Sequence, residues 1–596
     1  MPLKMSDIAA GLTELKTHYP FISDSEIVDE TLLAHFEDKT TYFKQLLSKD
    51  LGQEQVSNGI KELAYMVDCS RNAVPQVATL KQLIRLLALT GYNVLMLYME
   101  DVFEVDDEPY FGYLRGRYSK SELKEVVAYA DLFGIEVVPC IQTLAHYNQL
   151  TRWYEHLGVF DVADILLVGE PRMQLLIERI FKTLRECFTT KRINVGMDEA
   201  YLLGRGKYFD RHGGVARFDI MKQQLTFVDG LCQKYDFKPM MWSDMFFRLA
   251  FDNYYDIKGE LPEEITAMIA GKFDLVYWDY YHVDVDHYRK MMDIHLALKT
   301  NIYFAGGAWK WSGFTPDNRF SINTLTAGMQ AASEKKLDLF IVTAWGDNGG
   351  ESSLFSVLPA LIYSALLRDN QASKDNLNRV MSLLSGLRWN EYLLIDSANR
   401  GFREDHVDVT NTTNKTMLFN DPLLGVMDSL ATFIEIDNYQ MYKEQIATIP
   451  YQHSPFDYVF DVQVALLDVL ALKADLGLRL RKAYQAGDKK ALSHIAEQLP
   501  LLLSRLDVFS SKLHKQWHRE NKPHGFDVQD LRLGGLKERL RVTSQKLNAY
   551  LAGSLTSIEE LDEEILDYMC QGKEYTFDTR NCEYRLHRIS SVNVND

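Results

Sequence analysis

Cysteine is scarce in this 596-residue sequence, and the cysteines present form no recognisable motif. The six are Cys69, Cys140, Cys187, Cys232, Cys570 and Cys582, and no two of them make a C-x-x-C pair. A chain of this length buries a large core without disulfides, so we expect free thiols and a reducing compartment. Because no spacing of Cys and His is typical of a metal site, we expect no metal.

Long apolar runs and excess positive charge are also missing. No uninterrupted apolar stretch is long enough to cross a bilayer, and the N-terminal MPLKMSDIAAGLTEL has no apolar segment typical of a signal peptide. The net charge of -18 disfavours nucleic acid or an anionic membrane as the main partner. With 46% hydrophobic and 25% charged residues, the composition is typical of a soluble globular protein, and we expect a cytoplasmic one.

Eight short apolar runs, separated by amphipathic stretches, occupy the middle of the sequence. They are residues 63–70, 93–100, 135–142, 193–198, 239–244, 274–281, 302–307 and 340–347. Near-continuous apolar strands that alternate with helical patterns indicate parallel pairing. Eight such units in about 300 residues predict an α/β fold, a (β/α)8 TIM barrel. An open doubly wound sheet is the alternative, although its crevice would not recruit polar residues from nearly every strand end.

Two further regions flank the barrel. We expect residues 1–60 to form a short N-terminal α/β lead-in and residues 61–395 to form the catalytic barrel. Helical periodicity then replaces the strand pattern, so residues 396–596 are predicted to form an all-α C-terminal region. Its last part, residues 575–596, is expected to add a short strand or an ordered tail.

Residues 517–536, WHRENKPHGFDVQDLRLGGL, interrupt the helical periodicity of this C-terminal region. Pro523, Gly525, Gly534 and Gly535 are expected to break the pattern, and aromatic and basic side chains surround them. One interpretation is an ordinary interhelical loop. The other is a segment that docks at a barrel mouth, either its own or that of a second subunit in a homodimer.

Polar side chains end nearly every predicted strand, and tryptophan recurs beside them. The polar residues are Asp68, Glu100, Asp101, Gln142, Asp198, Glu199, Asp244, Asp279 and Asp347, and the tryptophans are Trp242, Trp278, Trp309, Trp311 and Trp345. In a barrel these strand ends surround one mouth, where the chemistry takes place. Indole rings stack on the apolar faces of pyranoses, and carboxylates bind their hydroxyls. Contact with solvent would explain the polar residues but not the tryptophans, so the pattern favours a sugar site.

Asp198 and Glu199 are adjacent, which is unusual for a pair of catalytic acids. Neighbouring side chains on a strand point to opposite faces, and two carboxylates that flank a glycosidic bond stand about 5 Å or more apart. Some glycosidases avoid this requirement, because the 2-acetamido group of the substrate serves as the nucleophile. One acid then protonates the leaving oxygen while the other orients the acetamide.

The segment NVGMDEA, residues 194–200, resembles the Asp-Glu signature of glycoside hydrolase family 20, the exo-β-N-acetylhexosaminidases. Other strand segments are similar to those of the family: MVDCSRNAVP, GYNVLMLYMED, GIEVVPCIQTLAHYN, MMWSD, VYWDYY and TAWGD. The resemblance covers roughly residues 60 to 365. It implies the TIM barrel and hydrolysis of terminal N-acetylhexosamines without a cofactor.

The resemblance also implies a role for each site residue. Glu199 would be the general acid and then the base for water, while Asp198 would hold the acetamide N–H and stabilise the oxazolinium ion. The remaining roles are Arg71 and Asp347 for sugar hydroxyls, Asp101 and His146 for substrate binding, and Trp242, Trp278 and Trp345 for an aromatic box around the acetamido methyl. An ionised Asp198 beside Glu199 favours a protonated Glu199 near neutral pH.

The sequence departs from the family pattern in three places. His146 follows Leu-Ala where the family has Pro-Gly, and the seventh strand, IYFAGGAWKWSGFTPDN, lacks the usual tyrosine and aspartate. We expect Tyr280 or Tyr281 to take the tyrosine role and Trp309 to lie in the site. The absence of a leading β-sheet domain of typical size and the long helical C-terminal region imply a divergent, bacterial-type intracellular branch that acts on small oligosaccharides.

The sequence thus predicts a retaining exo-β-N-acetylhexosaminidase that releases terminal β-linked GlcNAc, with GalNAc left open, by substrate-assisted catalysis. Its partner would be a small glycan with a terminal N-acetylhexosamine, and a two-fold homodimer would bury the apolar faces of the helical region. One alternative is a barrel glycosidase with a separate nucleophile such as Asp244 or Asp279. Another is a non-catalytic carbohydrate-binding protein.

Overall fold

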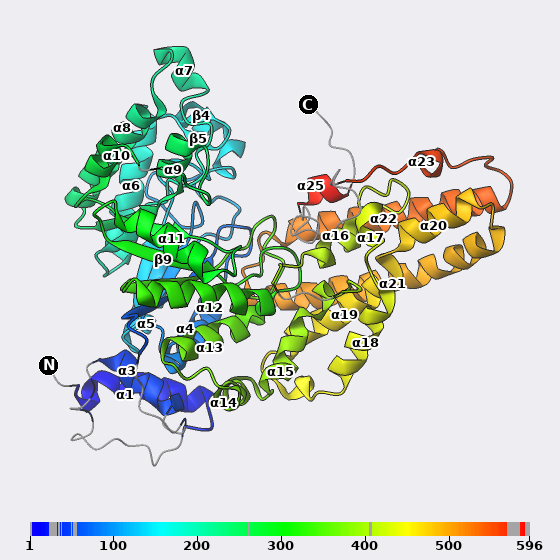
Figure 1. Ribbon diagram of the computed structural model, residues 1–596, viewed down its shortest axis with the longest axis horizontal. Helices are drawn as coiled ribbons and strands as arrows, with labels where there is room; N and C mark the ends of the chain where they lie inside the picture. Colours follow the sequence, from blue (N-terminus) through cyan, green and yellow to red (C-terminus); the bar gives the residue numbers. More distant parts are fainter. Residues whose placement is uncertain are drawn as a thin grey trace.

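The computed structural model describes residues 3–22, 33, 36, 38–48, 51, 57–259, 261–404, 408–568 and 585–590. Its centre is a closed barrel of eight strands, and each strand pairs in parallel with its neighbours (Figure 1). In order around the barrel they are β1 (Glu62–Asp68), β2 (Val94–Tyr98), β3 (Glu136–Cys140), β6 (Arg192–Asn194), β7 (Lys238–Trp242), β8 (Asp274–Trp278), β9 (Ile302–Gly307) and β10 (Leu339–Ala344). The predicted TIM barrel and its eight strands are confirmed.

The strands are apolar because both of their faces are covered. Five of the six residues of β1 that follow Glu62 are apolar, and every one of the six is buried. One strand face packs inside the barrel and the other packs against surrounding helices. These helices are α4 (Val77–Thr90), α5 (Lys120–Asp131), α6 (Pro171–Cys187), α8 (Arg217–Lys234), α11 (Val285–Leu296), α12 (Asn318–Glu334) and α13 (Leu358–Arg368).

Local sequence sets the ends of these helices. Ser119 and Glu122 form a capping box at the start of α5, each accepting a hydrogen bond from the backbone N–H of the other. Helix α4 ends at Gly91, whose φ of 84° lies in the left-handed region that glycine adopts without strain. Such signals fix where each strand begins, and so which residues reach the barrel mouth.

The described residues of the lead-in are helical. They include α1 (Met5–His18) and α3 (Lys39–Ser48), and among the described part of residues 1–60 no strand occurs. Phe43 of α3 packs edge-on against Phe133, and Lys44 forms an ion pair with buried Asp369. The lead-in therefore covers the side of the barrel near α4, far from the strand ends that carry the site (Figure 1).

The C-terminal region is helical, as predicted. Its long helices are α18 (Ile436–Ala447), α19 (Asp457–Lys473), α20 (Leu476–Gln485), α21 (Lys489–Glu520) and α22 (Phe526–Leu551). Helices α21 and α22 pack side by side and extend away from the barrel (Figure 1). Its last described helix, α25 (Leu586–Ile589), lies within the predicted tail. The domain boundaries at residues 60 and 395 stay predictions, and Cys570 and Cys582 lie outside the described residues.

The segment between α21 and α22 docks at the mouth of its own barrel. The backbone N–H of Lys522 donates to the carbonyl of Val74 over 2.8 Å, and that of Gln76 donates to Glu520 over 2.8 Å. Trp517 is buried and donates its indole N–H to the Lys522 carbonyl over 3.0 Å. The second interpretation of residues 517–536 is thus confirmed for docking within one chain. The expected break at Gly534 and Gly535 is wrong, because both lie inside the continuous helix α22.

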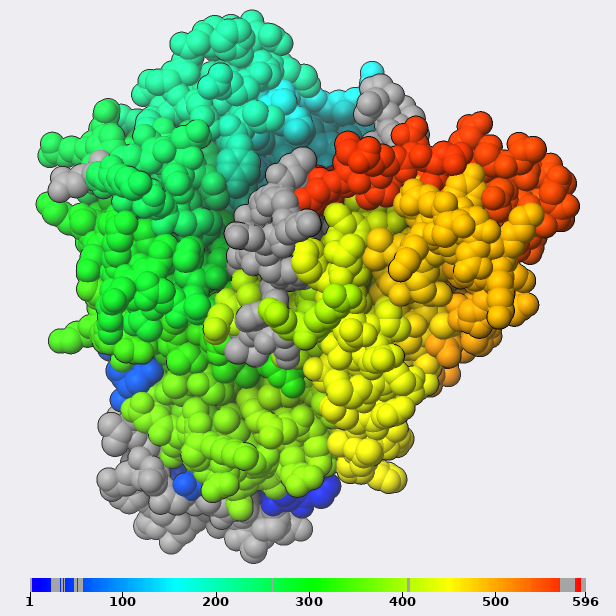
Figure 2. All heavy atoms as spheres, turned by 45° about the vertical axis from the view of Figure 1, so that its right-hand side comes forward, coloured from blue at the N-terminus to red at the C-terminus, as the bar shows by residue number. Residues whose placement is uncertain are grey.

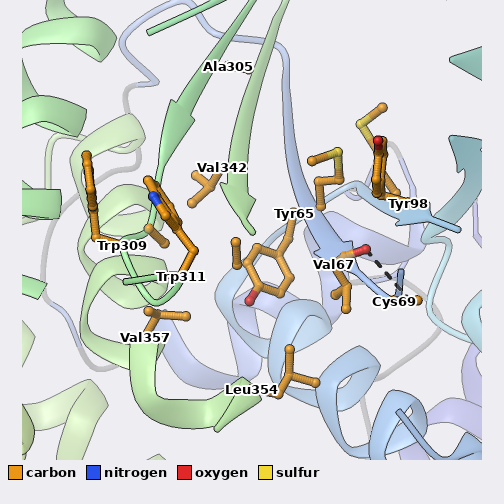
Figure 3. Close-up of a cluster of buried hydrophobic side chains, with 14 of the residues drawn as sticks. Tyr65, Val67, Cys69, Tyr98, Ala305, Trp309, Trp311, Val342, Leu354 and Val357 are labelled. Carbon is orange, nitrogen blue, oxygen red and sulfur yellow. Dashed lines mark hydrogen bonds between the residues drawn. The ribbon is translucent and has the colours of Figure 1, made fainter. Parts of the chain in front are cut away.

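Buried aromatic residues continue from the barrel into the loops at its mouth. Figure 3 shows Trp309 and Trp311, which follow β9, side by side in a cluster of buried side chains with Val342 and Val357. Their ring centroids lie 4.2 Å apart, in a stacked arrangement. No described helix is both long and apolar enough to cross a membrane.

Candidate active site

Asp198 and Glu199 leave β6 on a turn rather than on a strand. Gly196, Met197 and Glu199 have φ values of 72°, 70° and 53°. For Met197 and Glu199 this left-handed backbone is uncommon, and such strain is held only where the surroundings impose it. The turn removes the alternation of a strand, and as a result both acids face one cavity.

This cavity has a volume of about 560 Å³ and lies at the C-terminal ends of the strands. It is lined by Arg71, Tyr98, His146, Asn148, Asp164, Asp198, Glu199, Trp242, Trp278, Tyr280, Tyr281, Trp311, Trp345, Asp347, Asn348, Arg585 and His587. We call it the catalytic cavity. Nine of the eleven predicted site residues line it, and the exceptions are Asp101 and Trp309.

A second chamber of about 450 Å³ adjoins the catalytic cavity. The two share the side chains Arg71, His146, Asn148, Asp164 and Asn348. Its other walls come from the loop after β2, with Glu100 and Arg115, and from the start of α22, with Asp527 and Arg532. The docked α21–α22 segment therefore builds one side of this chamber, and among the described residues no Phe, Tyr or Trp lines it.

Asp198 is held as an ionised, buried carboxylate. Its Oδ1 accepts a hydrogen bond from the Gln142 amide over 2.7 Å, and its Oδ2 lies 3.1 Å from Nε2 of His146. Burial would raise the pKa of Asp198, but the charge of His146 and these hydrogen bonds outweigh it and hold the pKa below its ordinary value. Burial likewise opposes a charged His146, yet Asp198 raises the pKa of His146 to about 10.

Glu199 has different surroundings, although it is the next residue. Its side chain is 39% exposed against 11% for Asp198. Oε1 accepts a hydrogen bond from the hydroxyl of Tyr201 over 2.8 Å, and Oε2 lies 3.8 Å from Nε2 of His146. One carboxylate is thus buried and ion-paired, while the other faces the open cavity.

Asp244 and Arg248 fix the position of Glu199. The backbone N–H of Glu199 donates to Oδ2 of Asp244 over 3.1 Å, and Nε of Arg248 lies 3.3 Å from the same oxygen. The Arg248 guanidinium also lies over the Tyr201 ring, 4.9 Å from its centroid. Burial, followed by the charges of Asp198 and Glu199, raises the pKa of Asp244 to about 7.

Aromatic rings form the base of the cavity beside the acids. The Trp242 and Trp345 centroids are 5.8 Å apart, and Trp278 stacks on Tyr280 at 5.4 Å. The indole nitrogen of Trp242 is buried and has no hydrogen-bond partner among the described residues. Three indoles around one space make an apolar pocket that fits a small methyl-bearing group.

Two family models match this chain. The model described as "Glycosyl hydrolase family 20, catalytic domain" matches residues 64–338, and "Glycoside Hydrolase 20C C-terminal domain" matches residues 390–578. The chain belongs to glycoside hydrolase family 20. The resemblance carried by residues 194–200 is confirmed, and the second model adds the helical region, to which the resemblance did not extend.

Curated relatives of this family 20 chain include two mammalian proteins. Human hexosaminidase D is 24% identical over 349 residues, which is 52% of this chain and 68% of that protein. The bovine hexosaminidase D is 25% identical over 258 residues, or 41% of this chain and 68% of the relative.

Solved structures of the family are also similar at low identity. The Flavobacterium johnsoniae chitobiase is 14% identical with a TM-score of 0.41, covering 89% of this chain and 77% of that one. An exo β-N-acetylglucosaminidase from Vibrio harveyi is 13% identical with a TM-score of 0.39, and the match covers 54% of this chain but only 58% of that chain.

Asp101 does not reach the catalytic cavity of this family 20 chain. Its carboxylate is buried and lies 3.2 Å from Nη2 of Arg115. Glu100, the preceding residue, lines the adjoining chamber instead and forms an ion pair with Arg71. Glu100 has a φ of 43°, and this left-handed turn after β2 changes which of the two acids faces the mouth.

Trp309 is also displaced from its predicted place. It is 2% exposed and donates its indole N–H to the Tyr280 carbonyl over 2.9 Å. Trp311 lines the cavity, with Trp309 stacked on it (Figure 3). At Gly307 a Cβ would come within 2.7 Å of Trp311 and 3.1 Å of Tyr280, so glycine at the end of β9 permits this packing.

The two acids considered as alternative nucleophiles do not line the cavity. Asp244 is buried below Glu199, as described above. Asp279 is buried and accepts hydrogen bonds from the Tyr277 hydroxyl, 2.9 Å, and the Tyr281 N–H, 3.0 Å, besides two histidines. Burial opposes ionisation, but these histidines hold the pKa of Asp279 at about 2. Neither carboxylate is open to a substrate in the cavity.

Asp279, His282 and His287 form the group of described residues whose side chains could hold a metal ion. Their ligand atoms lie within 4.8 Å of one another, outside the catalytic cavity. Nδ1 of His282 is 2.8 Å and Nε2 of His287 is 3.1 Å from Oδ2 of Asp279, distances of ordinary hydrogen bonds. This cluster fastens the segment that carries Trp278, Tyr280 and Tyr281 into the site.

Several residues of the site went unnoticed in the sequence. Tyr201 carries a weak signal, because it stands two residues after Glu199. In the sequence Gln142 is identifiable only as a polar residue at a strand end, yet it holds Asp198. Arg585 and His587 carry no signal at all, because they are separated from the barrel by the whole helical region and lie outside any periodic pattern.

Proposed function

We propose that this family 20 enzyme is a retaining exo-β-N-acetylhexosaminidase that releases terminal β-linked GlcNAc, and GalNAc as a second sugar, through an oxazolinium intermediate. The observation that carries the proposal is the contrast between its two adjacent acids. Asp198 is buried, ion-paired and ionised, whereas Glu199 is partly exposed to the same cavity. Hexosaminidase D, a name that two curated relatives share, supports the same activity.

The positions of the acids favour an acetamido nucleophile. Both carboxylates come from one turn and approach the same nitrogen of His146, at 3.1 Å and 3.8 Å. They therefore lie on one side of the cavity, where they cannot attack the sugar from one face and protonate it from the other. Because Asp244 and Asp279 are closed off, the described residues offer no opposing carboxylate in the catalytic cavity other than Asp347 and Asp164.

In the first step Glu199 gives its proton to the leaving oxygen as the acetamide oxygen attacks the anomeric carbon. The bond to the leaving group breaks, and positive charge spreads onto the acetamide nitrogen. The ionised Asp198, fixed by Gln142 and His146, accepts the hydrogen bond from this nitrogen and stabilises the charge. Glu199 then takes a proton from water, which opens the oxazolinium ring with overall retention.

The substrate is held by the aromatic and charged walls. Trp242, Trp278 and Trp345 would enclose the acetamido methyl, and Tyr280 would face the acetamido oxygen. Arg71 and Asp347 would bind the hydroxyls of the terminal sugar. The buried indole box fits the acetamido methyl. A sugar with a hydroxyl at C2 would place that hydroxyl in the box without a hydrogen-bond partner, so the site selects 2-acetamido sugars over plain ones.

Tyr201, Asp244 and Arg248 act as positioning residues for Glu199. Asp244 fixes the strained backbone of Glu199 through its N–H, and Arg248 links Asp244 to the Tyr201 ring. The hydroxyl of Tyr201 donates to Oε1 of Glu199, which leaves Oε2 to carry the proton.

A panel of aryl glycosides that differ at C2 and C4 tests the proposal. We expect turnover of the GlcNAc compound, turnover of GalNAc within about 100-fold of it, and nearly no turnover of the glucoside, because a missing acetamide removes the nucleophile. Comparable hydrolysis of the glucoside would exclude the mechanism. No hydrolysis of any member would leave a carbohydrate-binding protein as the function. Cytoplasmic location and a homodimer stay predictions.

A further inference from the structure

Three aromatic side chains gather at the surface of the barrel mouth, and none of them lines either chamber. Tyr110 and Tyr113 lie in the loop after β2, and Trp153 lies in the segment after β3. The ring centroid of Trp153 is 5.4 Å from that of Tyr110 and 5.3 Å from that of Tyr113, and the two tyrosine centroids are 6.2 Å apart. Tyr110 is 39% and Tyr113 is 44% exposed, while Trp153 is half-buried. We call these three residues the aromatic platform.

A buried carboxylate joins the two segments that carry the platform. Glu108, in the loop after β2, is 1% exposed and accepts two hydrogen bonds from the guanidinium of Arg172 in α6, over 2.7 Å and 2.5 Å. Its Oε2 also lies 3.3 Å from Nε2 of His156, in the 3₁₀ helix η3 (Tyr154–Val159). Burial opposes ionisation of this carboxyl, but His156 and Arg172 hold the pKa of Glu108 at about 2. The backbone N–H of His156 in turn donates to the carbonyl of Trp153 over 2.9 Å.

The tyrosine side of the platform is fixed in the same way. Phe111, the neighbour of Tyr110, donates its backbone N–H to the carbonyl of Glu108 over 3.0 Å. The ring of Phe111 is buried and packs edge-on against Phe103, with centroids 5.2 Å apart. The three exposed or half-buried rings are therefore held in place before a ligand binds, and rigid aromatic side chains bind at a low cost in conformational entropy.

The platform borders the chamber that adjoins the catalytic cavity. Leu114, next to Tyr113 in sequence, and Arg152, next to Trp153, both line that chamber. The Arg152 guanidinium lies 5.7 Å from the centroid of the Trp153 ring. Figure 2 shows cyan residues, the colour of the segment after β3, at the surface near the upper edge of the barrel. A continuous surface thus leads from the catalytic cavity through the adjoining chamber to the platform.

The chamber and the platform offer the two kinds of contact that a sugar needs. Side-chain amides both donate hydrogen bonds to hydroxyls and accept them, and the chamber is lined by those of Asn72, Asn148, Gln149 and Asn348. The rings of the platform suit the apolar face of a pyranose. The chamber volume of about 450 Å³ is within the usual range of ligand pockets. A group of exposed apolar rings beside such a chamber marks a binding surface.

We infer that the aromatic platform is a second sugar-binding site, which holds a more distant sugar of the same glycan whose terminal N-acetylhexosamine lies in the catalytic cavity. This inference rests on the proposed hexosaminidase function and deepens it, because it makes oligosaccharides better substrates than disaccharides. One pyranose stacks on the platform, and the sugars before it lie in the adjoining chamber with their hydroxyls on its amides.

The test compares Trp153→Ala with the wild type on GlcNAc oligomers of two to six sugars and on an aryl N-acetylglucosaminide, which has a single sugar. For the wild type we expect kcat/KM to rise about 10-fold from the shortest to the longest oligomer, the effect of one aromatic contact with a sugar. In Trp153→Ala this rise should disappear, while the aryl substrate keeps its wild-type rate. The loss should appear in KM, because the contact is remote from the bond that breaks.

Three further variants separate a sugar-binding site from a structural effect. Tyr113→Ala removes another ring of the platform and should also reduce the rise with length, whereas Trp153→Phe keeps a ring and should retain part of it. Phe209→Ala is the matched control, because Phe209 in α7 (Lys207–His212) is 53% exposed and lines neither chamber. A rise with length that survives in both Trp153→Ala and Tyr113→Ala would overturn the inference, and so would an equal loss on the aryl substrate.

Two other measurements cover the remaining outcomes. A second copy of the chain is the other occupant that exposed rings suit, so light scattering compares the masses of the wild type and Trp153→Ala. A mass that falls from an oligomer to one chain would make the platform a subunit interface and contradict the inference. If the wild type hydrolyses the aryl substrate and the oligomers without any dependence on length, only the platform fails.

If the wild type hydrolyses no substrate of the panel, the proposed function fails, and calorimetric titration with the GlcNAc hexamer tests the platform by itself. Binding that is about 10-fold weaker in Trp153→Ala than in the wild type supports a sugar-binding platform. Equal binding by the two proteins, or no binding by the wild type, rejects it.

Discussion

The catalytic cavity has two walls built in different ways. The barrel wall consists of strand ends whose side chains are buried and fixed by several partners, as Asp198 is fixed by Gln142 and His146. The helical wall comes from the C-terminal region: α25 contributes charged side chains to the catalytic cavity, and α22 contributes charged side chains to the adjoining chamber. The difference indicates that the barrel wall carries the chemistry, while the helical wall adjusts which substrates reach it.

Among changes to the barrel wall, removal of the general acid should lower the rate of hydrolysis most. We expect Glu199→Gln to lower kcat about 10²–10⁴-fold for poor leaving groups and much less for a dinitrophenyl group, which departs without a proton. Steady-state kinetics over a series of leaving groups measures this slope. Glu178→Gln, a change of an acid outside the cavity, is the control. Equal losses across the series would assign the acid to another residue.

Loss of the Tyr201 hydroxyl should have a smaller effect of the same kind. Tyr201→Phe keeps the ring under Arg248 but removes the hydrogen bond to Oε1 of Glu199. We expect a loss of about 10-fold in kcat, larger for poor leaving groups, since a bond to a charged or reacting carboxyl contributes about 1.5–3 kcal/mol. Tyr154→Phe, at a tyrosine that is 90% exposed, should match the wild type. A uniform loss for all leaving groups would limit Tyr201 to substrate binding.

Asp244 offers a test of the barrel wall through stability. Its pKa in the folded state is about 7, above the ordinary 3.8, so unfolding releases a proton between these pH values and the free energy of unfolding falls as pH rises. In Asp244→Asn this fall is absent. We expect the variant to gain on the wild type by about 1.4 kcal/mol for each pH unit from pH 4 to 7, measured by urea unfolding. A constant difference over this range would show an ionised Asp244.

The helical wall should respond most weakly. Arg532 of α22 donates to the carbonyl and the side-chain oxygen of Asn348 over 2.6 Å and 2.9 Å, and Asn348 lines both chambers. We expect Arg532→Ala to raise KM about 3-fold with little change in kcat, because the contact is remote from the reacting atoms. Arg541→Ala, at an exposed position of α22, is the control. A loss in kcat as large as that of Tyr201→Phe would remove the distinction between the two walls.

The same distinction explains what the sequence could predict. Eight apolar runs predict eight buried strands, and the residues next to them predict the acids and the indole box, since periodicity and proximity in sequence determine both. Glu100 and Asp101 show the limit. A single left-handed residue, Glu100 with a φ of 43°, decides which carboxylate faces the mouth, and no pattern of residue types signals it. Trp311 rather than Trp309 lines the cavity, because Gly307 at the end of β9 leaves room for Trp311 beside Tyr280, a packing contact that the pattern of residue types does not signal.

The residues of the helical wall are harder to predict from the sequence than those of the barrel wall. Residues 517–536 carry a signal, because Pro523 and Gly525 lie between two helices, and docking at a barrel mouth is one of the two interpretations that the sequence allows. Arg585 and His587 carry none. Their place depends on tertiary packing of Ile589 and on α16 (Thr413–Phe419), which are contacts between distant parts of the chain.

The central claim is that the acetamide of the substrate, placed by Asp198 and the indole box, is the nucleophile. The most direct measurement is kcat/KM for a series of aryl glycosides whose 2-acetamido group carries zero, one, two or three fluorine atoms. Fluorine withdraws electrons from the acetamide oxygen and makes it a poorer nucleophile, while the leaving group stays the same. We predict a steep fall in kcat/KM along the series, of about 10-fold or more per fluorine atom. Rates that stay level across the series would contradict the account, because a carboxylate nucleophile does not respond to that change.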